Sequence, residues 1–157
     1  MRRYPNLIVL RTFSKVYGLA ALRVGYGLCA SDAFRTAVDQ LRQPFYLNAA
    51  AQAAAVEALK HQDEVERRVT QTLAARIDLE EGTRRLGVWV AESDANFIWL
   101  HLPDGLEEAA VVSGLRERGV LVRAGASLGR EGALRVTVGT GVENDRFVGA
   151  LGELLRG

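Results

Sequence analysis

One stretch of the sequence, residues 64–86, constrains the fold more than any other. It is rich in charged residues, and its apolar side chains recur largely at helical spacing, at Val65, Val69, Leu73, Ile77 and Leu86. This pattern predicts one long, largely exposed helix. A helix of this kind often links two domains, so we divide the chain into residues 1–62 and residues 63–157.

The first part carries two candidate strands. Residues 7–10 form a compact aliphatic run that follows Pro5, which is typical of a strand buried within an α/β sheet. Residues 24–29 form the second candidate strand. Lys15 lies just beyond the first strand and therefore falls in the connection between the two.

Two helices are expected after these strands. Ser31 is well placed to cap a helix over residues 32–42, and Pro44 stops it. Asn48 is well placed to cap a second helix over residues 49–60, where alanine, the strongest helix former, dominates.

The second part changes to short strands and short helices. Strands are expected over residues 88–90, 96–102, 120–123 and 134–138, and helices over residues 106–118 and 143–155. This order predicts a small α+β domain in which helices cover one face of a sheet.

Composition argues against several kinds of partner. The 20 basic and 19 acidic side chains give a net charge of +1, which provides no field to attract nucleic acid or an anionic membrane. No apolar run is long enough for a signal sequence or for the roughly 20 residues of a membrane-spanning helix. Cys29 is the only cysteine, which excludes an internal disulfide, and neither His61 nor His101 has a third ligand nearby for a metal. A soluble, cytoplasmic protein without a metal fits these features.

The segment at residues 11–26, RTFSKVYGLAALRVGY, concentrates side chains suited to chemistry. The hydroxyls of Thr12 and Ser14 and the guanidinium of Arg23 can share a phosphate. Lys15 can form an imine with a carbonyl if neighbouring positive charge or desolvation leaves its amine neutral. The spacing of these residues alone favours an ordinary solvated loop. Only the complete string can distinguish such a loop from a binding site.

Over its whole length this string resembles the lysine motif of the fold-type I pyridoxal-phosphate aminotransferases. The histidinol-phosphate branch of that family reads R-T-[FLM]-S-K-x-[FY]-G-L-A-G-L-R-[VI]-G-Y, and Ala21 is a departure from its usual glycine. The resemblance implies that Lys15 is the catalytic residue, which tethers pyridoxal 5'-phosphate and moves a proton at the substrate α-carbon. It also implies that Ser14 and Arg23, with Thr12, bind the cofactor phosphate.

The resemblance continues downstream. Residues 43–54 resemble the family segment R-x-P-[FY]-N-V-N-x-x-A-Q-x-A-A, with Tyr46 in place of its first asparagine, and residues 134–140 resemble the strand L-R-[IV]-T-[VI]-G-T. By this resemblance Arg135 binds the α-carboxylate of the amino donor. Arg123 binds the phosphate of histidinol phosphate or the distal carboxylate of glutamate, as suits a planar, permanently charged guanidinium. The alternative is that both are surface arginines at strand ends.

The resemblance implies an α/β fold, in which the C-terminal part of a pyridoxal-phosphate-dependent transferase large domain precedes a small α+β domain. It implies a homodimer that acts on small amino acids and 2-oxo acids, by amino transfer from histidinol phosphate to 2-oxoglutarate in histidine biosynthesis. It covers only the second half of a family member, and the family's aspartate for the pyridinium nitrogen is not found. We therefore expect a fragment from a truncated reading frame, nearly inactive alone, with unpaired sheet edges that favour aggregation or pairing with a partner.

Three alternatives remain open at this point. An aromatic-amino-acid aminotransferase and a relative of threonine-phosphate decarboxylase share the lysine motif, and they differ mainly in their substrate contacts. The third alternative is a non-catalytic fragment that acts only by association.

Overall fold

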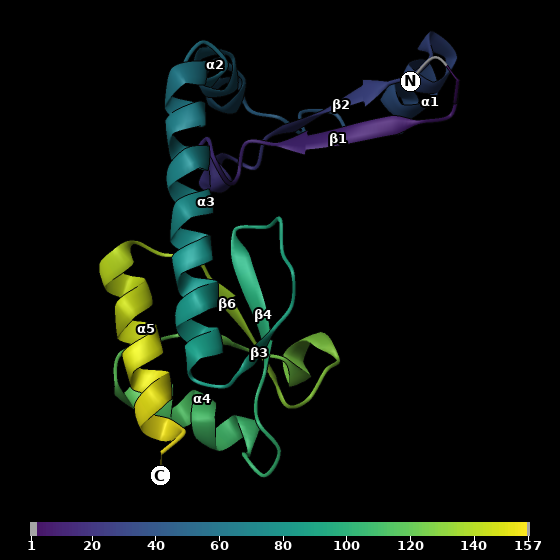
Figure 1. Cartoon of the computed structure of the whole chain (residues 1–157). Coiled ribbons are helices and arrows are strands. Elements are labelled where there is room, and N and C mark those ends of the chain that lie inside the picture. Colours follow the sequence, from purple (N-terminus) through teal and green to yellow (C-terminus); the bar gives the residue numbers. More distant parts are fainter. Residues whose placement is uncertain (1–2, 157) are drawn as a thin grey trace. The chain divides into compact units, whose positions relative to one another are not determined.

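The computed structural model describes residues 3–156 of the chain. Two compact units are present, unit 1 over residues 1–69 and unit 2 over residues 70–157. The long helix α3 (Gln62–Arg85) begins in unit 1 and ends in unit 2 (Figure 1), and it confirms the helix predicted for residues 64–86.

Unit 1 contains a two-stranded antiparallel sheet. Strand β1 (Ile8–Thr12) pairs with strand β2 (Gly25–Cys29), with Ile8 opposite Cys29 and Thr12 opposite Gly25. The prediction of a buried strand at residues 7–10 is wrong in one respect, because the side chain of Leu10 is 73% exposed. The apolar composition of residues 7–10 is that of a strand inside a larger sheet. Within residues 3–156, however, β1 and β2 have no further strand beside them.

The predicted caps of the next two helices are confirmed. Helix α1 (Asp32–Gln40) begins where the Ser31 hydroxyl accepts a hydrogen bond from the Phe34 amide at 3.3 Å. Helix α2 (Ala49–Ala58) begins where the Asn48 side-chain oxygen accepts one from the Ala51 amide at 2.8 Å. These bonds satisfy amides that have no partner within the helix itself. Both helices end two residues before the predicted positions.

The core of unit 1 joins helix α2 to the connection between β1 and β2. Phe13 and Val24, at the two ends of this connection, are buried together with Ala51 and Ala55 of α2. Alanine side chains are small, so the connection lies close to the helix. The Phe13 amide also donates to the Val24 carbonyl at 3.2 Å, which closes the connection into a loop.

The start of helix α3 holds the same loop. The Arg68 guanidinium donates to the Val16 carbonyl at 2.8 Å, across 52 positions of sequence. Its Nε also donates to Glu64 at 2.7 Å, and Arg67 donates to the same carboxylate at 2.7 Å. Hydrogen bonds from Arg67 and then Arg68 lower the pKa of Glu64 from 4.5 to about 2.

Unit 2 is built on a four-stranded antiparallel sheet in the order β3-β4-β6-β5. The strands are β3 (Trp89–Val90), β4 (Phe97–His101), β5 (Arg123–Ala124) and β6 (Ala133–Thr137). The helices are α4 (Glu108–Glu117), α5 (Gly141–Leu154) and the end of α3. Two short 3-10 turns, η1 (Ala20–Leu22) in unit 1 and η2 (Ala126–Leu128) in unit 2, complete the chain.

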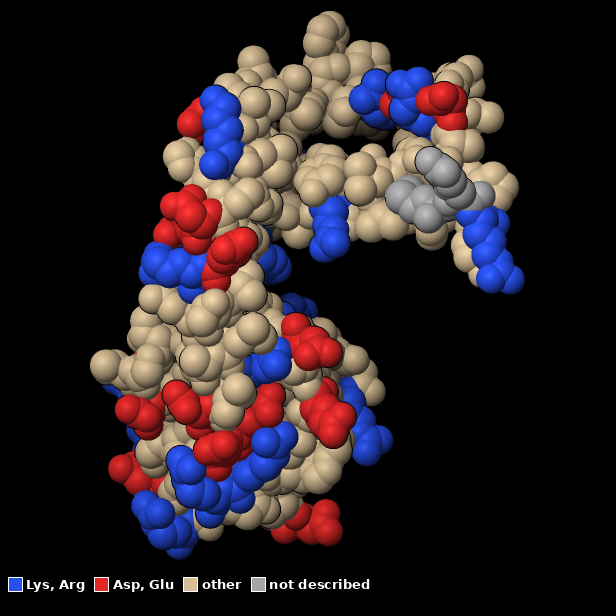
Figure 2. Space-filling view, turned by 45° about the horizontal axis from the view of Figure 1, so that its top comes forward, with Lys and Arg blue, Asp and Glu red and all other residues tan. Residues whose placement is uncertain are grey.

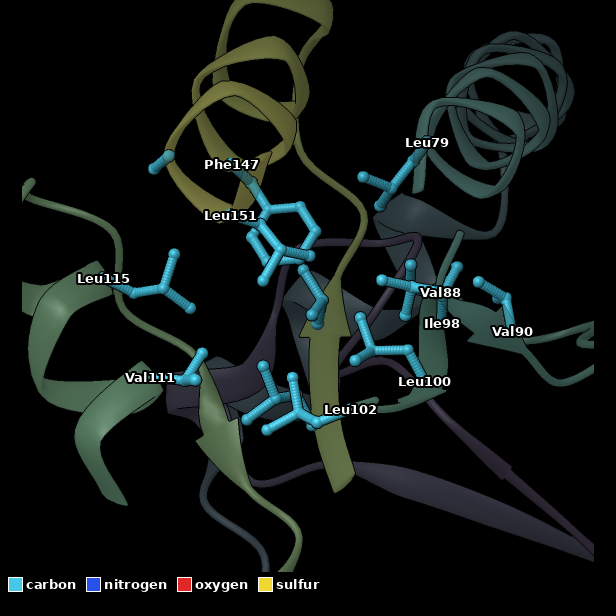
Figure 3. Packing of buried hydrophobic residues seen from close by; sticks show 13 residues of the cluster. Leu79, Val88, Val90, Ile98, Leu100, Leu102, Val111, Leu115, Phe147 and Leu151 are labelled. Atoms are coloured by element: carbon cyan, nitrogen blue, oxygen red, sulfur yellow. The ribbon is translucent and has the colours of Figure 1, made fainter. Parts of the chain in front are cut away.

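The core of unit 2 is formed by every second side chain along its strands. Buried side chains of β4 and β6 face the helices, and in Figure 3 Leu79 of α3, Leu115 of α4 and Leu151 of α5 gather around them. The strand residues that take part are Ile98, Leu100, Leu134 and Val136. The predicted small sheet with helices against one face is therefore confirmed.

One predicted strand is displaced. The run at residues 120–123 was expected to be a strand, but β5 begins only at Arg123. Val120 instead donates its amide to the Leu115 carbonyl at the end of α4, and both Val120 and Val122 pack against the core. In the sequence, the short run of apolar residues at 120–123 cannot be told apart from a buried strand, although it forms a connection that packs on the core.

Charges of both signs are interspersed on the face of unit 2 that Figure 2 shows, without a broad area of one sign. No helix within residues 3–156 is both long and apolar enough to cross a membrane.

Helix α5 begins with a capping box, in which Thr140 and Glu143 exchange hydrogen bonds between side chain and backbone. Thr140→Ala removes the hydroxyl that accepts the Glu143 amide, and we expect the free energy of unfolding of unit 2 to fall by about 1 kcal/mol. Urea denaturation followed by tryptophan fluorescence measures it, because Trp89 and Trp99 both lie in unit 2. Thr70→Ala, in the interior of α3, is the control and should lose nothing. Equal losses in the two variants would refute the role of the cap.

The lowered pKa of Glu64 predicts a specific pH dependence. The folded pKa of about 2 lies below the ordinary 4.5, so the unfolded chain binds the proton first as the pH falls. The stabilisation is complete above pH 4.5 and is lost as the pH falls through about 2. NMR titration of the side-chain carboxyl carbons should give Glu64 a midpoint near 2, which Arg67→Ala raises more than Arg68→Ala does. A midpoint at the ordinary value in the wild-type chain contradicts the assignment.

Candidate functional site

Lys15 occupies the loop between β1 and β2. Its backbone is fixed, because its carbonyl accepts the Gly18 amide at 2.8 Å and the Leu19 amide donates to the Phe13 carbonyl at 2.9 Å. The Lys15 side chain is exposed, and within residues 3–156 its amine has no hydrogen bond or ion pair. A fixed backbone with an unpaired amine is suited to covalent attachment of a carbonyl compound.

The two predicted hydroxyls flank Lys15 on its amino-terminal side. The Thr12 hydroxyl accepts the Ser14 amide at 3.0 Å, which turns the chain at the end of β1. Thr12 is exposed and Ser14 is half-buried. Thr12 is the last residue of β1 and Ser14 lies in the loop, so both are close to Lys15 along the chain.

Arg23 closes the loop in an unusual backbone conformation. Its φ is 52°, in the left-handed region that non-glycine residues seldom adopt. The Arg23 guanidinium donates to the Ala20 carbonyl at 2.8 Å through Nη1. Two residues later, at Gly25, a Cβ atom would lie 2.6 Å from the Arg11 carbonyl oxygen, so the close pairing of β2 with β1 requires glycine.

The donor set of this loop fits a phosphorylated aldehyde. An amine, two hydroxyls and a guanidinium lie within twelve residues of the chain, from Thr12 at the end of β1 to Arg23 in the closed loop. Pyridoxal phosphate needs an amine for its aldehyde and donors for its phosphate. The residues present are therefore suitable to hold that group.

The two predicted substrate arginines lie side by side on the sheet of unit 2. Arg123 of β5 is directly opposite Arg135 of β6, on the sheet face that points away from the core. Arg123 Nε donates to the Ser127 hydroxyl at 3.3 Å, and the Arg135 guanidinium carbon lies 4.0 Å from the centre of the Phe97 ring. Like charges opposite each other repel, so an anion bound between them relieves the repulsion.

Glu108 supports this arrangement, although the sequence analysis did not single it out. Its side chain is buried, with 7% exposed, and its two oxygens accept the amides of Ala126 and Ala133 at 3.1 Å each. These bonds hold both ends of the segment that joins β5 to β6. An acidic residue in the first turn of a helix is ordinarily assigned to the helix dipole, so the sequence carried no signal for this role.

Unit 2 also has an open hollow of about 910 Å³ after the end of α3, lined by Arg84, Gly87, Val88, Trp89, Val90 and Glu92. None of the predicted site residues lines it. No group of three or more His, Cys, Asp or Glu side chains suited to a metal occurs within residues 3–156.

Similarity to known proteins covers nearly the whole chain. Residues 1–151 match the family model of the class I and II aminotransferases. Histidinol-phosphate aminotransferase 2 of Pseudomonas fluorescens (strain Pf0-1) is 45% identical over 97% of this chain and 40% of its own length. Histidinol-phosphate aminotransferase of Bacillus pumilus (strain SAFR-032) is 40% identical over 100% of this chain and 42% of its own length.

Solved structures agree with this family. Histidinol-phosphate aminotransferase from Sinorhizobium meliloti, solved in complex with pyridoxal-5'-phosphate, is 30% identical and superposes with a TM-score of 0.81, over 97% of this chain and 42% of that one. The chain thus spans less than half the length of the relatives that it matches. This similarity shows that the chain, with its lysine loop and its arginine pair, belongs to the class I and II aminotransferase family.

Proposed function

We propose that this chain supplies the lysine and the substrate arginines of a pyridoxal-phosphate-dependent aminotransferase that acts on histidinol phosphate and 2-oxoglutarate. The observation that carries the proposal is the Lys15 loop, where a residue with an unpaired amine follows Thr12 and Ser14 in the chain and Arg23 closes the loop. The family and the names of the relatives support the choice of reaction.

Each residue of the loop has a distinct task. When pyridoxal phosphate is present, Lys15 Nζ would hold its aldehyde carbon with loss of water and, once freed by the incoming amine, would take the proton from the substrate α-carbon. Thr12, Ser14 and Arg23 bind the cofactor phosphate, which keeps the cofactor in place when Lys15 is released from it. The cofactor, when bound, supplies the electron sink that stabilises the carbanion at the α-carbon.

The arginine pair on unit 2 binds the anionic ends of the substrate. Arg135 binds the α-carboxylate of the amino donor, and Arg123 binds the phosphate of histidinol phosphate or the distal carboxylate of glutamate. Their opposite positions in β5 and β6 support this division, because two adjacent guanidiniums suit a ligand with more than one negative charge. Homodimer formation and cytoplasmic location stay predictions.

Covalent trapping tests the role of Lys15. We expect pyridoxal phosphate followed by borohydride to leave a stable adduct on Lys15, which peptide mass spectrometry locates. The sequence contains one other lysine, Lys60, whose amine pairs with Glu57 at 2.7 Å. Lys15→Ala should abolish the adduct, whereas Lys60→Ala should leave it intact. Equal labelling of both lysines would show that the loop does not select the cofactor.

The contact between Arg68 and Val16 predicts a second effect on the same adduct. Arg68→Ala frees the loop beside Lys15, so we expect the trapped yield at low cofactor concentration to fall several-fold, because an ordered site binds more tightly than a mobile one. Hydrogen exchange of the Gly18 amide, which donates to the Lys15 carbonyl, should also become faster. Arg67→Ala is the matched control, because Arg67 donates to the same Glu64 carboxylate from the neighbouring position of α3. If the two variants behave alike, Arg68 does not position the loop.

A further inference from the structure

We infer that Phe97 is a positioning residue for Arg135, which it holds by a cation–π contact so that the edge of the guanidinium stays available to a substrate anion. The inference rests on the proposed role of Arg135. It adds a specific residue, with a specific interaction, that this role requires.

The geometry of the sheet brings the two side chains together. Trp99 of β4 is directly opposite Arg135 of β6, and Phe97 is two residues away on β4, so Phe97 and Arg135 form a diagonal pair on one face. The guanidinium carbon lies 4.0 Å from the centre of the Phe97 ring, well within the roughly 6 Å range of a cation–π contact.

This contact leaves the hydrogen-bond donors of Arg135 unused. A ring attracts a cation without accepting its in-plane N–H groups in hydrogen bonds. Within residues 3–156 these N–H groups make no hydrogen bond and no ion pair. A carboxylate partner would occupy the same groups that a substrate anion needs. An aromatic partner therefore fixes the guanidinium without competing for them.

The backbone of Phe97 is itself fixed on both sides. The Ser93 hydroxyl donates to the Phe97 carbonyl at 2.8 Å, and the Arg76 guanidinium donates to the Ala95 carbonyl at 3.2 Å. The Val138 amide donates to the Asn96 carbonyl at 3.0 Å, beyond the end of the ladder between β4 and β6. A ring that is held in place restrains the arginine above it.

Arg123 is held by a hydrogen bond and not by a ring, which supports different tasks for Arg123 and Arg135 in binding the substrate. Its Nε is used by Ser127, whose hydroxyl donates in turn to the Ala124 carbonyl at 2.7 Å. A hydrogen bond to Nε leaves the two terminal nitrogens of Arg123 for an anion. Arg135 keeps its Nε as well, and so retains the Nε–Nη side for a two-pronged contact with a carboxylate.

Titration of the complete 157-residue chain with inorganic phosphate tests the inference, with NMR of the arginine Nε–H signals as the readout. In the wild-type chain the Arg135 signals should show the upfield shift of protons above an aromatic ring. Phe97→Leu keeps an apolar side chain but removes the ring, so this shift should vanish and phosphate should bind about two- to fivefold more weakly. Phe97→Tyr keeps the ring and should preserve both the upfield shift and the affinity for phosphate.

Two controls separate the possible failures. Trp89→Leu removes another ring of the same sheet, 58% exposed and on a strand that does not pair with β6, and it should leave phosphate affinity unchanged. Arg135→Ala should weaken phosphate binding at least as much as Phe97→Leu does. Far-UV circular dichroism of each variant checks that the chain is folded.

Each contrary result has a definite meaning. If Arg135→Ala weakens phosphate binding and Phe97→Leu does not, the inference is overturned and the proposed role of Arg135 stands. If Arg135→Ala has no effect, the proposed role of Arg135 fails and the inference fails with it, whereas the Lys15 adduct is judged separately. Absence of the upfield shift in the wild-type chain overturns the inference even if Phe97→Leu fails to fold.

Discussion

The strict alternation of side chains along β4 and β6 is the constraint on which unit 2 depends. Ile98, Leu100, Leu134 and Val136 point to the helices and are at most 5% exposed. The residues that alternate with them, including Phe97 and Arg135, must then point to the opposite face. The core and the candidate anion site are thus two sides of one sheet, and a shift of register by one residue would destroy both.

The Lys15 loop of unit 1 is stabilised in a different way, because it does not belong to a large sheet. The loop is held by Phe13 and Val24 on the alanines of α2, and by the Arg68 hydrogen bond to Val16. Arg68 in turn is fixed by Glu64, whose pKa is lowered to about 2 by the hydrogen bonds from Arg67 and Arg68. The predicted cofactor residues therefore lie on an ordered loop, although Lys15 and Arg23 are themselves exposed. An ordered loop with exposed functional groups is the usual requirement for a binding site on a connection between strands.

The hairpin formed by β1 and β2 exposes apolar side chains. Leu10 and Leu28 are 73% and 50% exposed, on two strands whose composition is that of a sheet interior. Exposed apolar side chains and free strand edges favour pairing with another polypeptide. The expectation of unpaired edges came from the length of the resemblance, and the exposure of these side chains agrees with it.

Local signals in the sequence determined much of this protein. Caps at Ser31 and Asn48, the helical spacing of α3 and the alternation of β4 and β6 each depend on neighbours within a few residues, so they could be predicted. The string around Lys15 likewise identified the family, because its residues are contiguous in the sequence. Local pattern failed at residues 120–123, where apolar side chains pack on the core without strand pairing.

Only the tertiary structure decided which distant residues meet. The sequence gives no register between strands, so it could not place Arg123 opposite Arg135 or Phe97 beneath the Arg135 guanidinium. Nor could it connect Arg68 to Val16, or the Glu108 carboxylate to the amides of Ala126 and Ala133. These contacts join residues far apart in the chain, and they are set by how helices and strands pack, which no local pattern encodes.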